Sequence, residues 1–300
     1  MADSPPFHRV IPADRWSLEV RSLLPPGEPR GVAVLGHAMM VDRRSMDRPE
    51  GGGLASTLAA AGFAVHLADL RGHGASGPVP SQGGSWGYDD IVWQDLPALV
   101  ADARERHPGV PVFLVGHSLA GHCALAAAGS GAYRGEPPDA HVMLAVNTWM
   151  RGLDTSRWRD LLRLRDMVAF RLLTTLCGRF PSRSLRMGPA DEAELYVADL
   201  VRTYFTGRWT SRDGVHDYYA NLPRVRGPVL SLVGAADRLM ANPEYVELWT
   251  QALTGAEVDL RVLRAGDFGL HVAPGHMELV TDAGSRGVWE EIARWMVSQS

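Results

Sequence analysis

One serine stands where a buried strand would turn directly into a helix. Ser118 lies in the run VGHSLAG at residues 115–121, between apolar residues 110–115 and a run of small residues that ends at Ala128. In such a turn the backbone is tight and strained, so the serine hydroxyl is lifted clear of the sheet edge. The helix N-terminus that follows points amide groups at negative charge formed beside the serine. The pattern predicts that Ser118 is a nucleophile.

The run resembles the nucleophile elbow of the α/β-hydrolase superfamily, and the likeness extends over nearly the whole chain. The elbow pattern Gly-x-Ser-x-Gly has Ala120 in place of its last glycine, with Gly121 one position later. A methyl group at this close-packed point strains the elbow slightly without excluding it. The resemblance implies an α/β-hydrolase fold, with a mostly parallel central sheet flanked by helices and with a catalytic acid and histidine downstream of the serine.

The acid of such a triad has one leading candidate. A serine hydroxyl needs a base within hydrogen-bond reach and a third group that orients the base. By resemblance the third group is Asp237, which follows the apolar strand 228–233 with the spacing Gly-x-x-Asp. The strand before it along the chain ends in Asn147 instead of an acid, so Asp154 is the one nearby substitute.

The histidine has two candidates in the last loop of the chain. His276 resembles the superfamily's terminal Gly-His turn before the final helix, whereas His271 lies five residues earlier. Gly275, directly before His276, lets the loop bend the imidazole back towards the serine. We favour His276 as the base and keep His271 as the alternative. His117 and His122 are expected to be structural or to line the pocket.

Acyl transfer also needs two hydrogen-bond donors for the oxyanion of the tetrahedral intermediate. The resemblance implies that the backbone amide of Leu119 is one donor, and that of Met39, in the loop after strand 31–35, the other. His37 aligns with the histidine of the superfamily's His-Gly motif, in which Ala38 replaces the glycine. We expect His37 to tie down this loop.

The residues around this centre predict a largely apolar substrate pocket. Met39, Met40 and Leu119 adjoin the expected oxyanion site, and a segment rich in Trp and Met follows residue 147. His37, Met40 and Trp149 are therefore the candidates for the pocket lining.

The elements that must position these residues follow an alternation of buried strands and amphipathic helices. This order implies right-handed crossovers and a parallel sheet. Strands are expected at 16–23, 31–35, 63–68, 110–115, 141–146, 228–233 and 258–263, and helices at 54–61, after the elbow to 128, and at 89–106, 242–253 and 287–297.

The alternation is interrupted once, between residues 148 and 227. This stretch holds helical segments near 157–177 and 191–205, and a loop of that length inside a compact core needs structure of its own. We therefore divide the chain into an α/β-hydrolase core, residues 1–147 and 228–300, and an insertion. By resemblance the insertion, residues 148–227, is a helical lid over the active site.

Two short motifs that suggest other chemistry are rejected on context. Gly72, Gly74 and Gly77 spell G-x-G-x-x-G, but Pro78 and the residues after it prevent the helix that a dinucleotide site requires. By resemblance Arg71 and His73 belong to a structural loop of the superfamily. The run Asp-Phe-Gly at 267–269 lacks the lysine and catalytic loop of a kinase.

Composition and charge narrow the function further. The 300 residues carry 30 basic and 34 acidic side chains, and neither sign forms a long run. The charge pattern therefore gives no indication of nucleic-acid binding. The spacing of Cys123 and Cys177 does not match a metal site or a disulfide framework. No apolar run is long enough for a membrane span. We expect a cytoplasmic protein without stable membrane insertion, cofactor or metal. A homodimer stays open.

The expected function is that of a serine hydrolase. It would cleave a carboxylic ester or thioester with an apolar moiety through an acyl-enzyme intermediate. Two alternatives stay open. The same triad could serve an acyltransferase or cyclase that acts on a biosynthetic intermediate, and the fold could serve a binding protein without catalysis.

Overall fold

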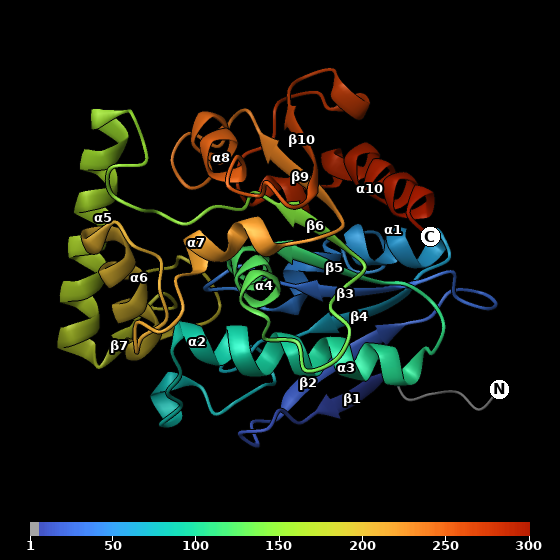
Figure 1. Ribbon diagram of the computed structural model, residues 1–300, viewed down its shortest axis with the longest axis horizontal. Helices are drawn as coiled ribbons and strands as arrows, with labels where there is room; N and C mark the ends of the chain where they lie inside the picture. Colours follow the sequence, from blue (N-terminus) through green and yellow to red (C-terminus); the bar gives the residue numbers. More distant parts are fainter. Residues whose placement is uncertain (1–5) are drawn as a thin grey trace.

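A single eight-stranded sheet forms the centre of the computed structural model, which describes residues 6–300 (Figure 1). The strand order is β1-β2-β4-β3-β5-β6-β9-β10, and the pairs from β4 to β10 are parallel, whereas β1 and β2 pair antiparallel. The bounds are β1 Phe7–Val10, β2 Leu18–Leu23, β3 Val32–Gly36, β4 Ala64–Ala68, β5 Val112–His117, β6 Ala140–Leu144, β9 Pro228–Gly234 and β10 Glu257–Leu263.

Both faces of the sheet are covered by helices at its centre, which explains why central strands such as β3 and β5 are buried along their whole length. Val34 and Leu114 point to the face that packs on α3 (Leu96–Arg106) and α4 (Leu119–Ser130). Leu35 and Val115, one residue further along the same strands, point to the face of α1 (Leu54–Ala60) and α10 (Arg286–Ser298). The sequence-based expectation of a mostly parallel sheet flanked by helices is thus confirmed.

Several elements differ from the expectation in detail. Strand β1 was not predicted, because it is only four residues long and half of it is exposed. The helix expected at 89–106 begins as α2 (Tyr88–Asp90) and passes through a π-helical turn, Ile91–Asp95, before α3. The helix expected at 242–253 is α8 (Pro243–Thr250), and a short helix, α9 (Glu278–Thr281), follows the last loop.

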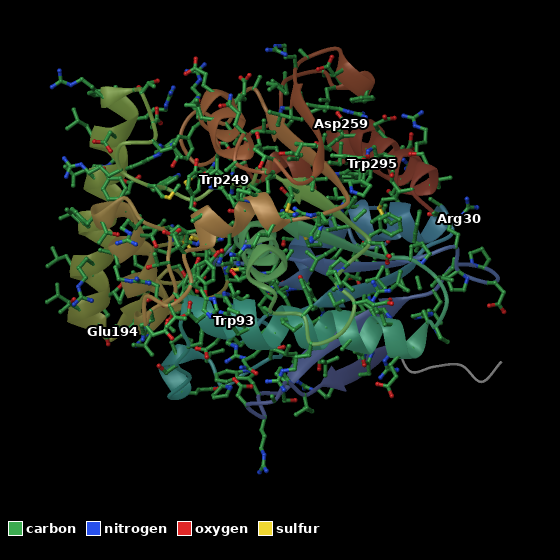
Figure 2. The ribbon with its side chains drawn as sticks, in the orientation of Figure 1. Arg30, Trp93, Glu194, Trp249, Asp259 and Trp295 are labelled. Atoms are coloured by element: carbon green, nitrogen blue, oxygen red, sulfur yellow. The ribbon has the colours of Figure 1, made fainter. Side chains whose placement is uncertain are left out.

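The insertion between β6 and β9 consists mainly of two packed helices (Figure 1). Its elements are α5 (Arg157–Cys177), β7 (Arg179–Phe180), β8 (Glu192–Ala193), α6 (Glu194–Thr206) and α7 (Tyr218–Asn221). Ser156 caps α5 by accepting a hydrogen bond from the Arg159 amide, and Gly178 ends it in the left-handed conformation. Helices α5 and α6 lie to one side of the sheet, with Glu194 at their outer edge (Figure 2). Trp249 of α8, by contrast, is buried inside the molecule.

The described helices are too short or too polar for a membrane span. Within residues 6–300, none combines the length and the apolar character needed to cross a bilayer.

Candidate active site

The turn between β5 and α4 holds Ser118 in a strained conformation. Its φ of 49° and ψ of −108° lie in a region that side-chain-bearing residues rarely adopt. The turn is fixed on both sides, because the Ser118 amide donates to the Leu144 carbonyl (3.0 Å) and the Ser118 carbonyl accepts from the His122 amide (3.1 Å). The serine is therefore presented at the carboxyl edge of the sheet, as the elbow pattern predicts.

The departure from the elbow motif is matched by a glycine on the neighbouring strand. A Cβ placed on Gly36, in β3, would lie 2.5 Å from the Ala120 Cβ. Ala120 therefore fills the space that Gly36 leaves. Gly116 and Gly121 face each other at similar range, since a Cβ on Gly116 would lie 2.4 Å from the Gly121 Cα. The close approach of helix and strands depends on these pairs.

Asp237 and His276 form a short hydrogen bond beside the elbow. The His276 Nδ1 atom lies 2.6 Å from the Asp237 Oδ2 atom, and the Asp237 side chain is almost fully buried. Asp237 follows β9, which is two strands from β5 in the sheet. The loop of His276 comes close because Gly234 ends β9; a Cβ there would lie 1.9 Å from the Pro274 carbonyl oxygen.

The other candidates for the acid and the base lie elsewhere. His271 is exposed, and its side chain makes no hydrogen bond in the part of the chain that the structure describes. Asp154 pairs with Arg159 at 2.9 Å and with Arg163 at 2.7 Å inside the insertion. The structure thus brings His276, and not His271, to Asp237, and it gives Asp154 a structural role.

His117 connects the elbow to the loop of His276. Its Nε2 atom lies 3.0 Å from the His276 carbonyl oxygen, and the two ring centroids are 5.0 Å apart. Complete burial lowers the pKa of His117 well below its ordinary value, so the imidazole is neutral. Its one N–H donates to the carbonyl, and this bond ties the loop of His276 to the residue that precedes Ser118.

Two backbone amides beside the elbow have no acceptor. Those of Leu119 and Met39 make no hydrogen bond to any of residues 6–300. Their segments are held together because the Ala120 amide donates to the His37 carbonyl (3.3 Å). His37 is buried in the loop itself, where its Nε2 atom accepts from the Leu70 amide at 3.1 Å and its Nδ1–H donates to the Ala38 carbonyl at 2.7 Å.

Glu192, in the insertion, holds the other end of this loop. Its Oε1 atom accepts from the Met40 amide and lies 3.1 Å from the His73 Nε2 atom. Burial lowers the pKa of His73, but the Glu192 carboxylate outweighs it and the net direction is upward. Sequence reasoning missed Glu192, because no local pattern marks a contact between residues more than a hundred positions apart. The sequence had suggested only that His73 belongs to a structural loop.

A narrow pocket opens beside Ser118, with a cavity volume of about 80 Å³. None of the described residues that line it carries a charged side chain. The lining consists of Met39, Tyr88, Ser118, Leu119, His122, Ala145, Asn147, Thr148, Trp149, Met167, Phe170, Tyr196, Leu200, Thr203, Trp209 and Met240.

The lining corrects part of the sequence-based expectation. Trp149, Met39 and Leu119 are in the pocket, but His37 and Met40 are not. His37 is fully buried under the loop. Met40 has a φ of 63°, which turns the chain away from the pocket so that its amide reaches Glu192. Sequence gives little sign of such a turn, because the left-handed conformation favours glycine.

His122 is the histidine among the described residues that line this pocket. It lies one helical turn after Ser118, stacks on Tyr88, and its Nδ1 atom lies 2.7 Å from the Tyr88 Oη atom. Burial lowers the pKa of His122 to about 3, so the ring is neutral and has one N–H. Nδ1 is thus bonded to the phenol, whereas Nε2 makes no hydrogen bond to any of the described residues.

Solved structures with this fold come from several lipases and esterases. A soluble variant of monoglyceride lipase from Saccharomyces cerevisiae has a TM-score of 0.66 at 16% identity, covering 95% of this chain and 92% of its own. Monoacylglycerol lipase from Paleococcus ferrophilus has 0.57 at 18%, covering 94% and 99%. A thermophilic esterase from Thermogutta terrifontis has 0.59 at 18%, covering 98% of each chain. At these identities the likeness establishes the fold.

Sequence comparison identifies the family. No curated protein is similar enough in sequence to count as a match. The model of the family described as serine aminopeptidase, S33, matches residues 28–264, which include the elbow and Asp237. The chain therefore belongs to this family of α/β-hydrolases.

Proposed function

We propose that the chain is a serine esterase that cleaves carboxylic esters with an apolar moiety through an acyl-enzyme intermediate. The observation that carries the proposal is the Asp237–His276 hydrogen bond, on a loop that the bond from His117 to the His276 carbonyl ties to the residue before the strained Ser118. A nucleophile, a base and an orienting carboxylate in this order are the parts that acyl transfer requires.

In the proposed reaction the Ser118 hydroxyl attacks the ester carbonyl while His276 Nε2 takes its proton. Asp237 keeps the other ring proton on Nδ1 and stabilises the imidazolium. The oxyanion accepts hydrogen bonds from the unpaired amides of Leu119 and Met39. His276 then gives the proton to the leaving alcohol, and water, activated by the same imidazole, releases the acid and regenerates the serine.

The lining of the pocket favours an ester over the N-terminus of a peptide. An aminopeptidase binds the charged α-ammonium group of its substrate, and a buried charge needs a partner of opposite sign. None of the described lining residues is an aspartate or a glutamate. Burying an ammonium group beside Met167, Phe170 and Trp209 would therefore be unfavourable, whereas an uncharged apolar acyl or alcohol part fits this surface.

The insertion is proposed to act as a lid. Half of the lining belongs to residues 148–227, including Trp149, Met167, Phe170, Tyr196 and Trp209. A cavity of about 80 Å³ is far smaller than the roughly 300–1,000 Å³ of typical ligand sites. Substrate access thus requires the α5–α6 pair to move away from the core.

Labelling by an alkyl fluorophosphonate tests this proposal, followed by kinetics on aryl esters of increasing acyl length. We expect stoichiometric labelling of the wild-type chain, none in Ser118→Ala, and a kcat/KM that rises with acyl length until the pocket is filled. Product analysis with added alcohol or amine separates a hydrolase, which gives only the acid, from an acyltransferase or cyclase. An unlabelled wild-type chain would instead indicate a binding protein without catalysis.

A further inference from the structure

Three histidines and an aspartate gather at the antiparallel edge of the sheet, on elements that the proposed reaction does not use. His8 lies in β1, His66 in β4, Asp102 in α3 and His107 directly after α3. None of them lines the pocket beside Ser118. The His66 side chain is buried, and those of His8 and Asp102 are mostly covered. Burying such ionisable groups costs free energy unless they are paired or coordinate a metal.

The ligand atoms of His8, His66 and Asp102 converge on one point. The His8 Nε2 atom lies 2.9 Å from the Asp102 Oδ2 atom, and the His66 Nδ1 atom lies 3.7 Å from that oxygen. One ligand atom from each of the three residues lies within 4.8 Å of the others. In a tetrahedral zinc site, bond lengths near 2.0–2.1 Å separate ligand atoms by about 3.3 Å. The two measured distances lie on either side of that value.

Each of the three groups also has a partner on its other side. The His66 Nε2 atom lies 3.3 Å from the His107 Nε2 atom, and the His8 Nδ1 atom lies 3.5 Å from the Ser22 Oγ atom. The Asp102 Oδ1 atom accepts from Arg106 Nε at 2.9 Å, so that Oδ2 faces the histidines. Metal-binding histidines usually donate their second ring N–H in this way, which fixes the tautomer and the ring orientation.

We propose that His8, His66 and Asp102 form a binding site for a divalent transition-metal ion, best matched by Zn²⁺. The ligand atoms are His8 Nε2, His66 Nδ1 and Asp102 Oδ2, with water as the fourth ligand. His107 is a positioning residue whose Nε2 atom accepts a hydrogen bond from His66 Nε2–H. Two imidazoles and one carboxylate suit zinc rather than Mg²⁺ or Ca²⁺, which prefer oxygen ligands alone. The proposal departs from the expectation, drawn from the sequence, that no metal is bound.

A metal at this point would join three elements far apart in the sequence. It would link β1 to β4, which are separated in the sheet by β2, and both to the C-terminal turn of α3. Because a folded site binds the metal and the unfolded chain holds it weakly, the ion stabilises the fold by mass action. The site is thus structural, and its occupancy is independent of the chemistry at Ser118.

Titration of the chelator-treated, full-length chain with Zn²⁺ in competition with a chromogenic chelator tests the proposal. We expect one Zn²⁺ per chain, a higher thermal unfolding midpoint with Zn²⁺ than with Mg²⁺, and, with Co²⁺, the visible absorption of a tetrahedral site. His8→Ala and His66→Ala should each weaken Zn²⁺ binding at least about 100-fold, and His107→Ala about 10- to 100-fold.

His271→Ala is the matched control, because it removes an exposed histidine outside the cluster. It should leave the affinity for Zn²⁺ unchanged. If His66→Ala does not fold, His8→Gln, on the short edge strand, tests the same ligand set. The proposal is overturned if the wild-type chain shows no saturable binding at one equivalent. It is also overturned if the His8 variants bind Zn²⁺ as tightly as the wild type. Fluorophosphonate labelling of the same samples reports separately on Ser118.

Discussion

Replacing Asp237 by asparagine should abolish most of the esterase activity while leaving the shape of the site intact. Asp237 accepts a hydrogen bond from His276 Nδ1–H at 2.6 Å and is almost fully buried, so the side chain has little room to relax. In Asp237→Asn the amide group donates to Nδ1, and the ring proton then lies on Nε2. An imidazole in that tautomer cannot take the proton of Ser118.

The size of the loss follows from these two effects together. The variant loses both the correct tautomer and a charge-assisted hydrogen bond, which is roughly twice as strong as a neutral one. For the equivalent change in a Ser-His-Asp triad kcat falls about 10⁴-fold, which corresponds to about 5.4 kcal/mol of transition-state stabilisation. KM should change little, because Asp237 is not among the residues that line the pocket.

The assay is single-turnover and steady-state hydrolysis of the best aryl ester, with the thermal unfolding midpoint measured alongside. Asp267→Asn makes the same chemical change at an exposed turn, where Asp267 accepts from the Arg264 amide at 2.7 Å, and should leave kcat within about twofold. The double variant of Asp237→Asn with His276→Ala should be no slower than the worse single variant, since the two residues act as a unit. An Asp237→Asn enzyme that keeps more than a tenth of the wild-type kcat would refute the assignment.

Three further outcomes are expected from other parts of the molecule. His122→Phe removes the imidazole from the described pocket lining, so the preference for esters with an extra hydrogen-bonding group over plain alkyl esters should fall about tenfold, measured as a ratio of kcat/KM. Gly36→Ala should destabilise the chain by about 1–3 kcal/mol in urea unfolding, and adding Ala120→Gly should recover most of it; equal losses in the single and double variants would contradict the contact. Burial lowers the pKa of His141 to about 4. Between pH 6.5 and 4 the unfolded state therefore binds a proton that the folded state lacks. The free energy of unfolding then falls as the pH falls, by up to about 1.4 kcal/mol per pH unit. His141→Leu should remove that part of the slope in urea unfolding at pH 5 and pH 8 without loss of stability at pH 8, because both ring nitrogens are buried without a partner among the described residues.

The elements that could be predicted are those whose signals are local. Strands β3 and β5 are apolar at successive positions because both faces are covered, and that pattern is visible in the sequence alone. Helix α5 was predicted with its observed bounds, since Ser156 and Gly178 are good caps at its two ends. The elbow was recognisable for the same reason: the strand, the turn and the helix are contiguous.

The contacts that could not be predicted join distant segments. Glu192 accepts from the Met40 amide across about 150 residues, and His8 meets Asp102 across more than 90. Neither pair belongs to a repeated pattern or a motif, so the sequence gives no sign of which groups meet. The misplacement of Met40 has the same origin, because its direction depends on a left-handed backbone angle that nothing in the residue type requires.

The neighbours of Ser118 hold the candidate site together through backbone and close-packing contacts. His117 donates to the carbonyl of His276, the Ala120 amide donates to the carbonyl of His37, and the Ala120 methyl group fills the space above Gly36. Two separate segments, the loop of His276 and residues 36–37, are thus fixed to the elbow itself. None of these contacts involves the insertion, whose Glu192 instead holds the other end of the Met39 loop through the Met40 amide. Alanine at position 120, in place of the motif's glycine, is tolerated because residue 36 is glycine. The packing limits the space that these two residues share.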